Sequence, residues 1–132
     1  MRRDDDGFTL VEILVVMLIL GVLAAIAIPV FLGQQEKAFR SVLVSDMRTL
    51  QMAQASRAVN GQPRYTDDLD DLRAEGFARS EPVVGVNVDL FDQGGEQEYV
   101  ACLKHEGLDD WLVFNSLSGV TTYSPTECVA PS

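Results

Sequence analysis

The sequence predicts an α+β fold in which one long N-terminal helix packs on a small antiparallel sheet. Three observations carry this prediction. An apolar run extends from Phe8 to Leu32, an amphipathic helical pattern continues to about residue 59, and short alternating apolar segments with glycine-containing turns fill residues 84–119. With 132 residues the chain has the length of one domain, of which about 100 residues would form a soluble head behind a membrane segment.

The apolar run from Phe8 to Leu32 contains 25 residues, of which only Glu12 is ionisable. As a helix it would measure roughly 37 Å, enough to cross a bilayer core of about 30 Å. The alternative is a removable secretory signal, in which Arg2 and Arg3 would form the basic region before a small-residue cleavage site. The uninterrupted core from Ile13 to Val30 is longer than such signals usually have, so a membrane helix is favoured.

Glu12 places a charge where a bilayer opposes it. A carboxylate at the centre of a membrane helix costs about 2.5 to 3.5 kcal/mol on insertion scales, so an acid in such a segment usually has a partner or a function. Because Glu12 lies only four residues into the run, the alternative is that its side chain reaches the headgroup layer.

The helical pattern continues beyond the apolar run as an amphipathic segment. Apolar residues recur every three or four positions, while basic and polar residues occupy the positions between them. Gly61 and Pro63 provide a stop. The apolar positions are Phe39, Leu43, Met47, Leu50 and Ala53.

Residues 65–77 predict a short helix at the start of the head. Thr66 would be its N-cap, aspartates fill its first turn, and Gly76 would end it. Leu69, Leu72 and Phe77 would pack it against the rest of the head.

Alternating apolar residues predict three or four antiparallel strands that lie on the amphipathic helix. Tight turns are expected at residues 94–95, 106–107 and 118–119, and His105, next to one of them, is expected to face solvent. The residues expected to face inward are Val84, Val86, Val88, Leu90, Tyr99, Ala101, Leu103, Trp111 and Val113.

Four acids surround the first of these turns, namely Asp89, Asp92, Glu96 and Glu98. A calcium loop is one interpretation, since carboxylate oxygens are the ligands that Ca²⁺ prefers. The interpretation we favour is an acidic hairpin turn that binds no metal.

The sequence contains no pattern typical of an enzyme. It has no nucleophile elbow, no phosphate-binding loop and one histidine, so we expect neither catalysis nor a cofactor. Two cysteines and His105 cannot complete a four-ligand zinc site. If the head is exported, a disulfide is the expected use of Cys102 and Cys128.

The charges divide the chain into a basic stem and an acidic head. Residues 33–64 hold five basic and two acidic side chains, a net charge of +3, whereas residues 65–132 hold three basic and fourteen acidic ones, a net charge of −11. Such a head is a poor phosphate binder, so nucleic acid is not an expected partner. We expect instead that the stem of one molecule attracts the acidic head of another, in a contact that loosens at high salt.

The segment GFTLVE at residues 7–12, followed by an apolar stretch that contains Gly21 and Pro29, resembles the N-terminal signature of type IV prepilins and the related pseudopilins. The resemblance implies that a membrane aspartyl peptidase removes residues 1–7 by cutting after Gly7, and that the new N-terminal Phe8 is N-methylated. The mature chain would have 125 residues and a net charge of −9. The leader itself departs from the family pattern, because it contains three consecutive aspartates where basic residues are usual.

The same resemblance assigns roles to other residues. Glu12 would pair with the new α-amine of Phe8 on a neighbouring subunit and thereby fix the register of assembly. The helix between Gly21 and Pro29 would unwind in the filament. Cys102 and Cys128 would close a C-terminal loop that shapes the exposed surface of each subunit.

The predicted organisation is a leader at residues 1–7, a transmembrane and filament-core helix at 8–32, its amphipathic continuation at 33–61 and an acidic globular head at 62–132. Together these parts correspond to the type IV pilin fold, with its disulfide-closed C-terminal loop.

The function implied is that of a pilin, a structural subunit that polymerises into a helical, homo-oligomeric type IV pilus. Its expected partners are the prepilin peptidase and methylase, the assembly machinery in the membrane, and membrane lipid before assembly. It would be a single-pass protein of the cell membrane and then part of an extracellular pilus. The alternatives are a pseudopilin of a type II secretion or DNA-uptake system, and a single-pass exported binding protein with no assembly role.

Overall fold

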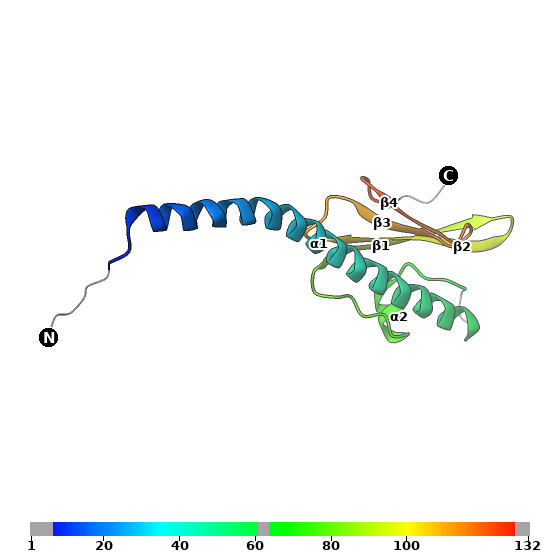
Figure 1. Cartoon of the computed structure of the whole chain (residues 1–132). Helices are drawn as coiled ribbons and strands as arrows, with labels where there is room; N and C mark the ends of the chain where they lie inside the picture. Colours follow the sequence, from blue (N-terminus) through cyan, green and yellow to red (C-terminus); the bar gives the residue numbers. More distant parts are fainter. Residues whose placement is uncertain (1–6, 61–63, 129–132) are drawn as a thin grey trace. The chain divides into compact units, whose positions relative to one another are not determined.

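The computed structural model describes residues 7–60 and 64–128. The stop at Gly61 and Pro63 and the leader residues 1–6 lie outside these ranges. The elements follow one another as α1 (Leu10–Val59), α2 (Leu69–Ala74), β1 (Val83–Gln93), β2 (Glu96–His105), β3 (Trp111–Asn115) and β4 (Val120–Ser124) (Figure 1). The predicted α+β fold is thereby confirmed. By its contacts the chain divides into two units after residue 35, and each is described by itself.

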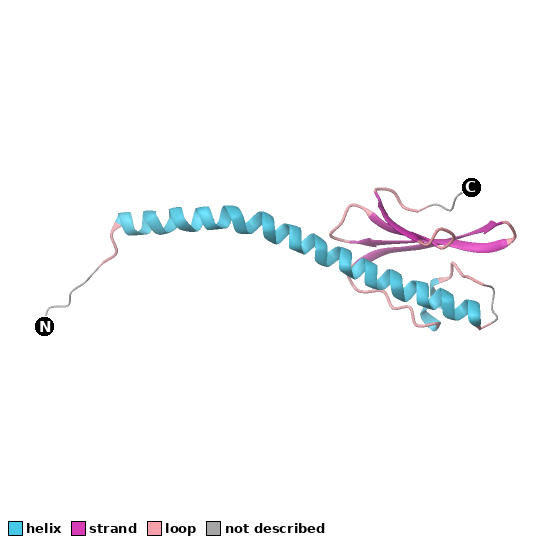
Figure 2. Cartoon of the chain, turned by 45° about the vertical axis from the view of Figure 1, so that its right-hand side comes forward, coloured by secondary structure: helices cyan, strands magenta, loops and turns pink. Residues whose placement is uncertain are grey.

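The second unit is built on the amphipathic part of α1, which packs against one face of the sheet (Figure 2). Four of the five predicted apolar positions on this helix are buried, and the fifth, Phe39, is partly buried against the same core. Each such leucine or methionine contributes about 1.5 to 3 kcal/mol by leaving water. Facing them from the sheet are Val88, Tyr99, Ala101, Leu103 and Leu112.

The sheet is an antiparallel meander with the strand order β1-β2-β3-β4. Gly94 and Gly95 join β1 to β2 with φ angles of 66° and 89°. Two consecutive residues with positive φ form the two-residue turn whose twist matches a hairpin, and glycine adopts this conformation at the lowest cost. The turn that the sequence predicted here is confirmed.

Three of the nine strand residues predicted to face inward do not, one in β1 and two in β3. In β1 the register shifts between Val83 and Gly85, so Val83 is buried and Val84 is 54% exposed. In β3 the buried residue is Leu112, whereas Trp111 and Val113 lie on the opposite face, beside the cysteines. The indole of Trp111 covers Gly85, where an added Cβ would lie 2.7 Å from the ring. The glycine therefore provides the space that lets this tryptophan face outward.

The expectation that His105 faces solvent is also wrong. Its side chain is 2% exposed, and its ring stacks on Phe39 with 4.2 Å between the ring centroids. Its Nδ1 accepts a hydrogen bond from the backbone N–H of Gly107 at 2.9 Å. His105 is the next inward-facing position of β2 after Leu103. Its hydrogen bond offsets the cost of burying a polar ring.

The N-cap of α2 is Asp68 rather than the predicted Thr66. The Asp68 side chain accepts a hydrogen bond from the backbone N–H of Asp70. Thr66 is held elsewhere, because the buried amide of Gln54 in α1 donates to its carbonyl at 2.6 Å and accepts from its N–H at 3.0 Å. Gly76 ends the helix as predicted, with a φ of 100°.

One buried acid connects α1 to the loop before β1. Asp46 is 4% exposed, and its two carboxylate oxygens accept hydrogen bonds from the backbone N–H and the hydroxyl of Ser80, both at 2.8 Å. A hydrogen bond to a charged group contributes about 1.5 to 3 kcal/mol, and a buried donor left without a partner destabilises the fold further.

We expect Asp46→Ala to lower the free energy of unfolding of the head by about 2 kcal/mol, because both donors of Ser80 lose their acceptor. Urea unfolding of the full chain in detergent micelles measures this change. Asp46→Asn is the matched control, since its amide oxygen still accepts one of the two bonds, and it should lose less. Equal stability of the alanine variant and the wild type would contradict this role.

Candidate functional site

The candidate site is the beginning of α1, where the chain enters the helix through a capping box. Thr9 is the N-cap, and its hydroxyl accepts a hydrogen bond from the backbone N–H of Glu12 at 3.2 Å. The Glu12 carboxylate reaches back to the Thr9 backbone N–H at 2.8 Å and also accepts from its hydroxyl at 3.0 Å. This reciprocal arrangement satisfies donors that the first turn of a helix leaves open. Glu12 is therefore held at the end of the helix by its own chain.

We expect Thr9→Val to weaken the start of α1 by about 1 kcal/mol, the usual effect of losing an N-cap. The measurement is amide hydrogen exchange at residues 10–13 of the full chain in micelles, which should become faster. Thr9→Ser keeps the hydroxyl and should exchange like the wild type. Unchanged protection in the valine variant would show that the capping box does not stabilise the helix.

The first unit presents its apolar side chains outward. All residues from Gly7 to Gln35 are exposed, and Phe8 is 85% exposed. An 18-residue window of α1 reaches a mean hydropathy of 3.1, and none of it is buried. By length and composition α1 is a helix that fits a membrane anchor.

The two predicted interruptions, Gly21 and Pro29, both lie inside the continuous helix α1. A Cβ added to Gly21 would meet nothing within 4 Å. The packing of this chain therefore does not require glycine at that position. The predicted unwinding between Gly21 and Pro29 concerns the filament and stays a prediction.

Among the residues that the structure describes, no cation lies beside Glu12. Within residues 7–60 and 64–128 it makes no ion pair, and its hydrogen bonds all go to Thr9. The carboxylate lies among exposed apolar side chains that include Phe8, Val11 and Val15. Such a charge is costly in lipid unless an opposite charge from another molecule approaches it.

Most basic residues of the stem form ion pairs within their own chain, and the expected attraction between copies stays a prediction. Arg57 pairs with Asp71 at 2.8 Å, and Arg64 lies 3.5 Å from Glu96. Three of the five stem cations, including Arg40, thus pair with acids of their own head.

Arg40 is the most strongly held of these cations. It pairs with Glu36 at 2.9 Å and with Asp110 at 3.0 Å, and its guanidinium lies 4.1 Å from the centre of the Tyr123 ring. The hydrogen bonds to Glu36, and then those to Asp110 and Tyr123, raise the pKa of the Arg40 side chain above its ordinary value. It is a fixed positive charge that joins the helix to β4 and to the loop before β3.

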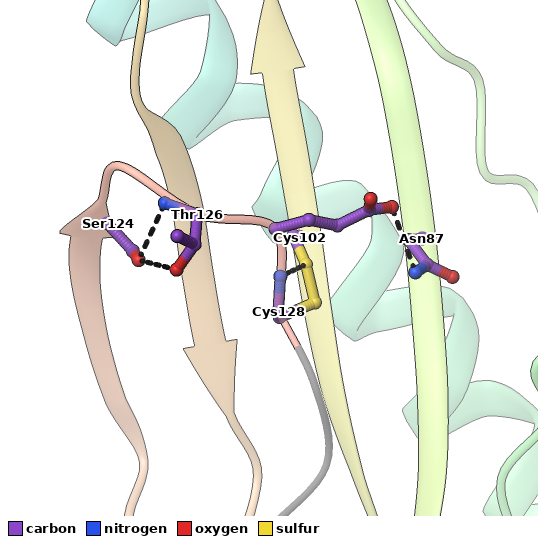
Figure 3. Close-up of a disulfide and its surroundings, with 6 residues drawn as sticks. Asn87, Cys102, Ser124, Thr126 and Cys128 are labelled. Atoms are coloured by element: carbon purple, nitrogen blue, oxygen red, sulfur yellow. Dashed lines mark hydrogen bonds between the residues drawn. A yellow bond between two sulfur atoms is a disulfide. The ribbon is translucent and has the colours of Figure 1, made fainter.

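The predicted disulfide between Cys102 and Cys128 is confirmed, with 5.8 Å between the two Cα atoms. Figure 3 shows the segment after β4 crossing β3 to reach Cys102 on β2. The Cys128 N–H also donates to the Cys102 sulfur at 2.9 Å, and Asn87 of β1 donates to Glu127 at 3.1 Å. The C-terminal segment is therefore fixed across the face of the sheet that α1 does not cover.

The four acids considered for calcium do not form one cluster. The register places Asp92 on the helix-facing side of the hairpin, and Asp89, Glu96 and Glu98 on the other. Glu98 is buried and accepts a hydrogen bond from the Ser116 hydroxyl at 2.6 Å. Within the part of the chain that the structure describes, no group of three or more metal-ligating side chains lies close enough to hold an ion.

Several of these contacts were not anticipated from the sequence. The capping box could have been found, because Thr9 and Glu12 have the spacing of its signature. Asp46 and Gln54 could not, because a polar residue among apolar helix positions does not reveal its partner 34 or 12 residues away.

Comparison with known proteins supports the resemblance that the N-terminal motif indicated. Residues 2–28 match the family model described as the prokaryotic N-terminal methylation motif, a range that includes Gly7, Phe8 and Glu12. No solved structure matches the chain.

Three relatives illustrate the similarity. The type II secretion system core protein G of Aeromonas hydrophila is 37% identical over 83 residues, 61% of this chain and 58% of that protein. The protein of the same description from Pectobacterium carotovorum is 53% identical over 91 residues, 58% of each chain. The type IV major pilin protein PilA of Myxococcus xanthus is 39% identical over 74 residues, 56% of this chain and 32% of that protein.

The matched regions thus cover less than two thirds of each relative. Pilins and secretion proteins both occur among the relatives, and the fold agrees with both. The chain thus carries the prepilin-type methylation motif, its helix-on-sheet fold matches the type IV pilin fold, and its relatives include both a pilin and secretion-system proteins.

Proposed function

We propose that the chain is a structural subunit rather than an enzyme. It is cut between Gly7 and Phe8, N-methylated at Phe8, and polymerised through its N-terminal helix into a filament of the cell envelope. The observation that carries this proposal is the single acid of the apolar helix, Glu12, which has no cationic partner within the described residues of its own chain. Cleavage would create an α-amine four residues from this acid, on every copy.

The geometry supports a contact between copies rather than within one. Glu12 is already engaged with Thr9, so it lies at the helix end in a fixed orientation. An amine presented by a neighbour shifted along the filament axis would meet a charge that is pre-oriented and poorly solvated in lipid. On assembly, the exposed apolar surface of α1 would leave the lipid and pack against the helices of other subunits.

For the machine that contains the filament, we propose a pseudopilus of the type II secretion kind. The relatives from Aeromonas and Pectobacterium, which are named for that system, support this choice. The second candidate is a type IV pilus at the cell surface. The similarity to the Myxococcus pilin and the disulfide, a common feature of pilins, favour it. In both cases the partners would be the prepilin peptidase, the assembly machinery and membrane lipid.

Mass spectrometry of the mature chain, followed by isolation of filaments, tests the proposal. We expect a chain that begins with N-methylated Phe8 and that is found in filaments. Gly7→Val should retain the leader. Gly33→Ala is the matched control, because an added Cβ meets nothing within 4 Å at either glycine. A mature chain that begins at Ile28 would show an ordinary signal peptide and would favour an exported binding protein without an assembly role.

Deletion of the gene separates the two machines. Loss of secreted enzymes from the medium, with surface filaments unchanged, would support the pseudopilus. Loss of long surface filaments with normal secretion would support the pilus.

A further inference from the structure

The side of α1 turned away from the core positions carries a groove of about 620 Å³. Its lining residues come from α1 alone and lie within the second unit. The lining combines apolar and small polar side chains with cations, among them Lys37, Ser41, Val44, Ser45, Arg48 and Met52.

Two cations of this groove are available for an external partner. Lys37 and Arg48 are exposed, and neither makes an ion pair with a residue in the described ranges, in contrast to Arg40, Arg57 and Arg64. Met52 is 63% exposed and adds an apolar surface at the same groove. A partner that fits would be acidic and narrow enough to lie along one helix.

The β1–β2 hairpin has these properties. Its last four residue pairs, from Leu90 with Tyr99 to Gln93 with Glu96, extend beyond the part of β2 that pairs with β3. We call residues 90–99 the hairpin arm. All five residues from Asp92 to Glu96, at its turn, are exposed. The arm holds three acids and no basic residue.

The acids at the turn of the arm are only lightly engaged by their own chain. Asp92 makes no ion pair with any residue that the structure describes. Glu96 faces Arg64 at 3.5 Å, but the two side chains are 69% and 47% exposed. An ion pair with such exposure contributes little and is readily exchanged for another.

The arm and the groove lie apart on the same unit, so the arm does not fill its own groove. The turn of the arm lies toward the C-terminal end of α1 (Figures 1 and 2), where Gln97 accepts a hydrogen bond from the Tyr65 N–H at 3.0 Å. The groove instead runs from Lys37, roughly 33 Å before the end of the helix at Val59, to Met52, on the side of α1 turned away from the core positions. Complementary surfaces at different places on one unit generate a head-to-tail contact, which produces open helical polymers when the rotation does not close.

We propose that the acidic turn of the hairpin arm of one copy docks in the α1 groove of another copy, with Lys37 and Arg48 facing Asp92 and Glu96. This inference rests on the proposed function, because it describes how the heads of a filament meet. It keeps the sequence-based expectation of stem-to-head attraction but limits it to Lys37 and Arg48, the two stem cations that make no ion pair within the described ranges.

A carbodiimide, which joins a carboxylate to an amine without a spacer, tests this contact on isolated filaments of the full chain. The amines of the processed chain are Lys37, Lys104 and the α-amine of Phe8, so the products are few and can be told apart by mass spectrometry of the cross-linked peptides. We expect a dimer on a denaturing gel, with Lys37 joined to Asp92 or Glu96. Lys37→Arg is the matched control: it keeps the charge, so filaments should form, but this cross-link should disappear.

Charge reversal supplies a second measurement. Arg48→Asp should lower the filament yield by about tenfold, and combining it with Asp92→Arg should restore most of that loss. Arg79→Asp changes an exposed arginine outside the groove and should leave the yield unchanged.

The outcomes separate this inference from the proposed function. Filaments that cross-link Lys37 to other acids, or that tolerate Arg48→Asp, would overturn the docking of the arm and leave the filament proposal intact. A processed wild-type chain that forms no filament would overturn both.

Discussion

Glu12→Ala is expected to abolish filament formation while the processed chain accumulates in the membrane. Without the carboxylate, the α-amine of Phe8 on one subunit has no opposite charge on its neighbour. The contact that would set the register between the two subunits is then lost. The effect should be nearly complete, since the polymer repeats this contact at every subunit. Separation of sheared filaments from membranes, followed by immunoblotting of both fractions, measures it.

Two variants distinguish the charge of Glu12 from its capping role. Glu12→Gln keeps an oxygen that can accept from Thr9 but has no charge, so we expect it to fail in assembly like the alanine variant. Thr9→Val removes the cap and keeps the charge, so it should still form filaments. Normal filaments from the glutamine variant would show that capping, and not charge, is what assembly requires.

Loss of the disulfide is expected to have the largest effect on the stability of the head. Replacing both Cys102 and Cys128 with alanine should lower the free energy of unfolding by on the order of 3 kcal/mol, because the bond closes a long loop in the unfolded chain. For a head of this size that corresponds to a fall in Tm of roughly 12 to 24 °C. Thermal unfolding of the full chain in micelles, with and without reductant, measures it.

Asn87→Ala is the control for the disulfide, since it removes only the hydrogen bond to Glu127 and leaves the covalent bond. Its effect should be about 1 kcal/mol or less. Reductant should lower the Tm of the wild type and of this control, and should leave the double alanine variant unchanged. A double variant as stable as the wild type would mean that the C-terminal segment stays in place without the bond.

The fold could be predicted from the sequence wherever a periodic pattern was decisive. The amphipathic positions of α1 and the glycine turn at residues 94–95 follow from local rules that need no knowledge of distant residues. The inward-facing residues of the strands were harder to predict, because alternation defines two opposite faces of a strand but does not show which face the helix covers. Trp111 was placed on the wrong face for this reason. Only the space above Gly85 shows where its ring lies.

The candidate site could be located but not described from the sequence. The motif at residues 7–12 pointed to Glu12, and the spacing of Thr9 and Glu12 is also the signature of the capping box that the structure shows, although this spacing was not used in the prediction. The sequence correctly indicated that the stem carries an excess of positive charge. Among the described residues three of these cations form ion pairs and two do not, and this division depends on contacts with residues up to 70 positions away.

The burial of Leu43, Met47 and Leu50 against the sheet decides where a soluble fragment of this protein has to begin. A fragment that starts at residue 62, at the edge of the sequence-defined head, would leave the inner face of the sheet uncovered and prone to aggregation. A fragment that starts near residue 36 keeps the helix that covers this face and omits the apolar run. In practical terms, half of the long helix belongs to the head and has to be expressed with it.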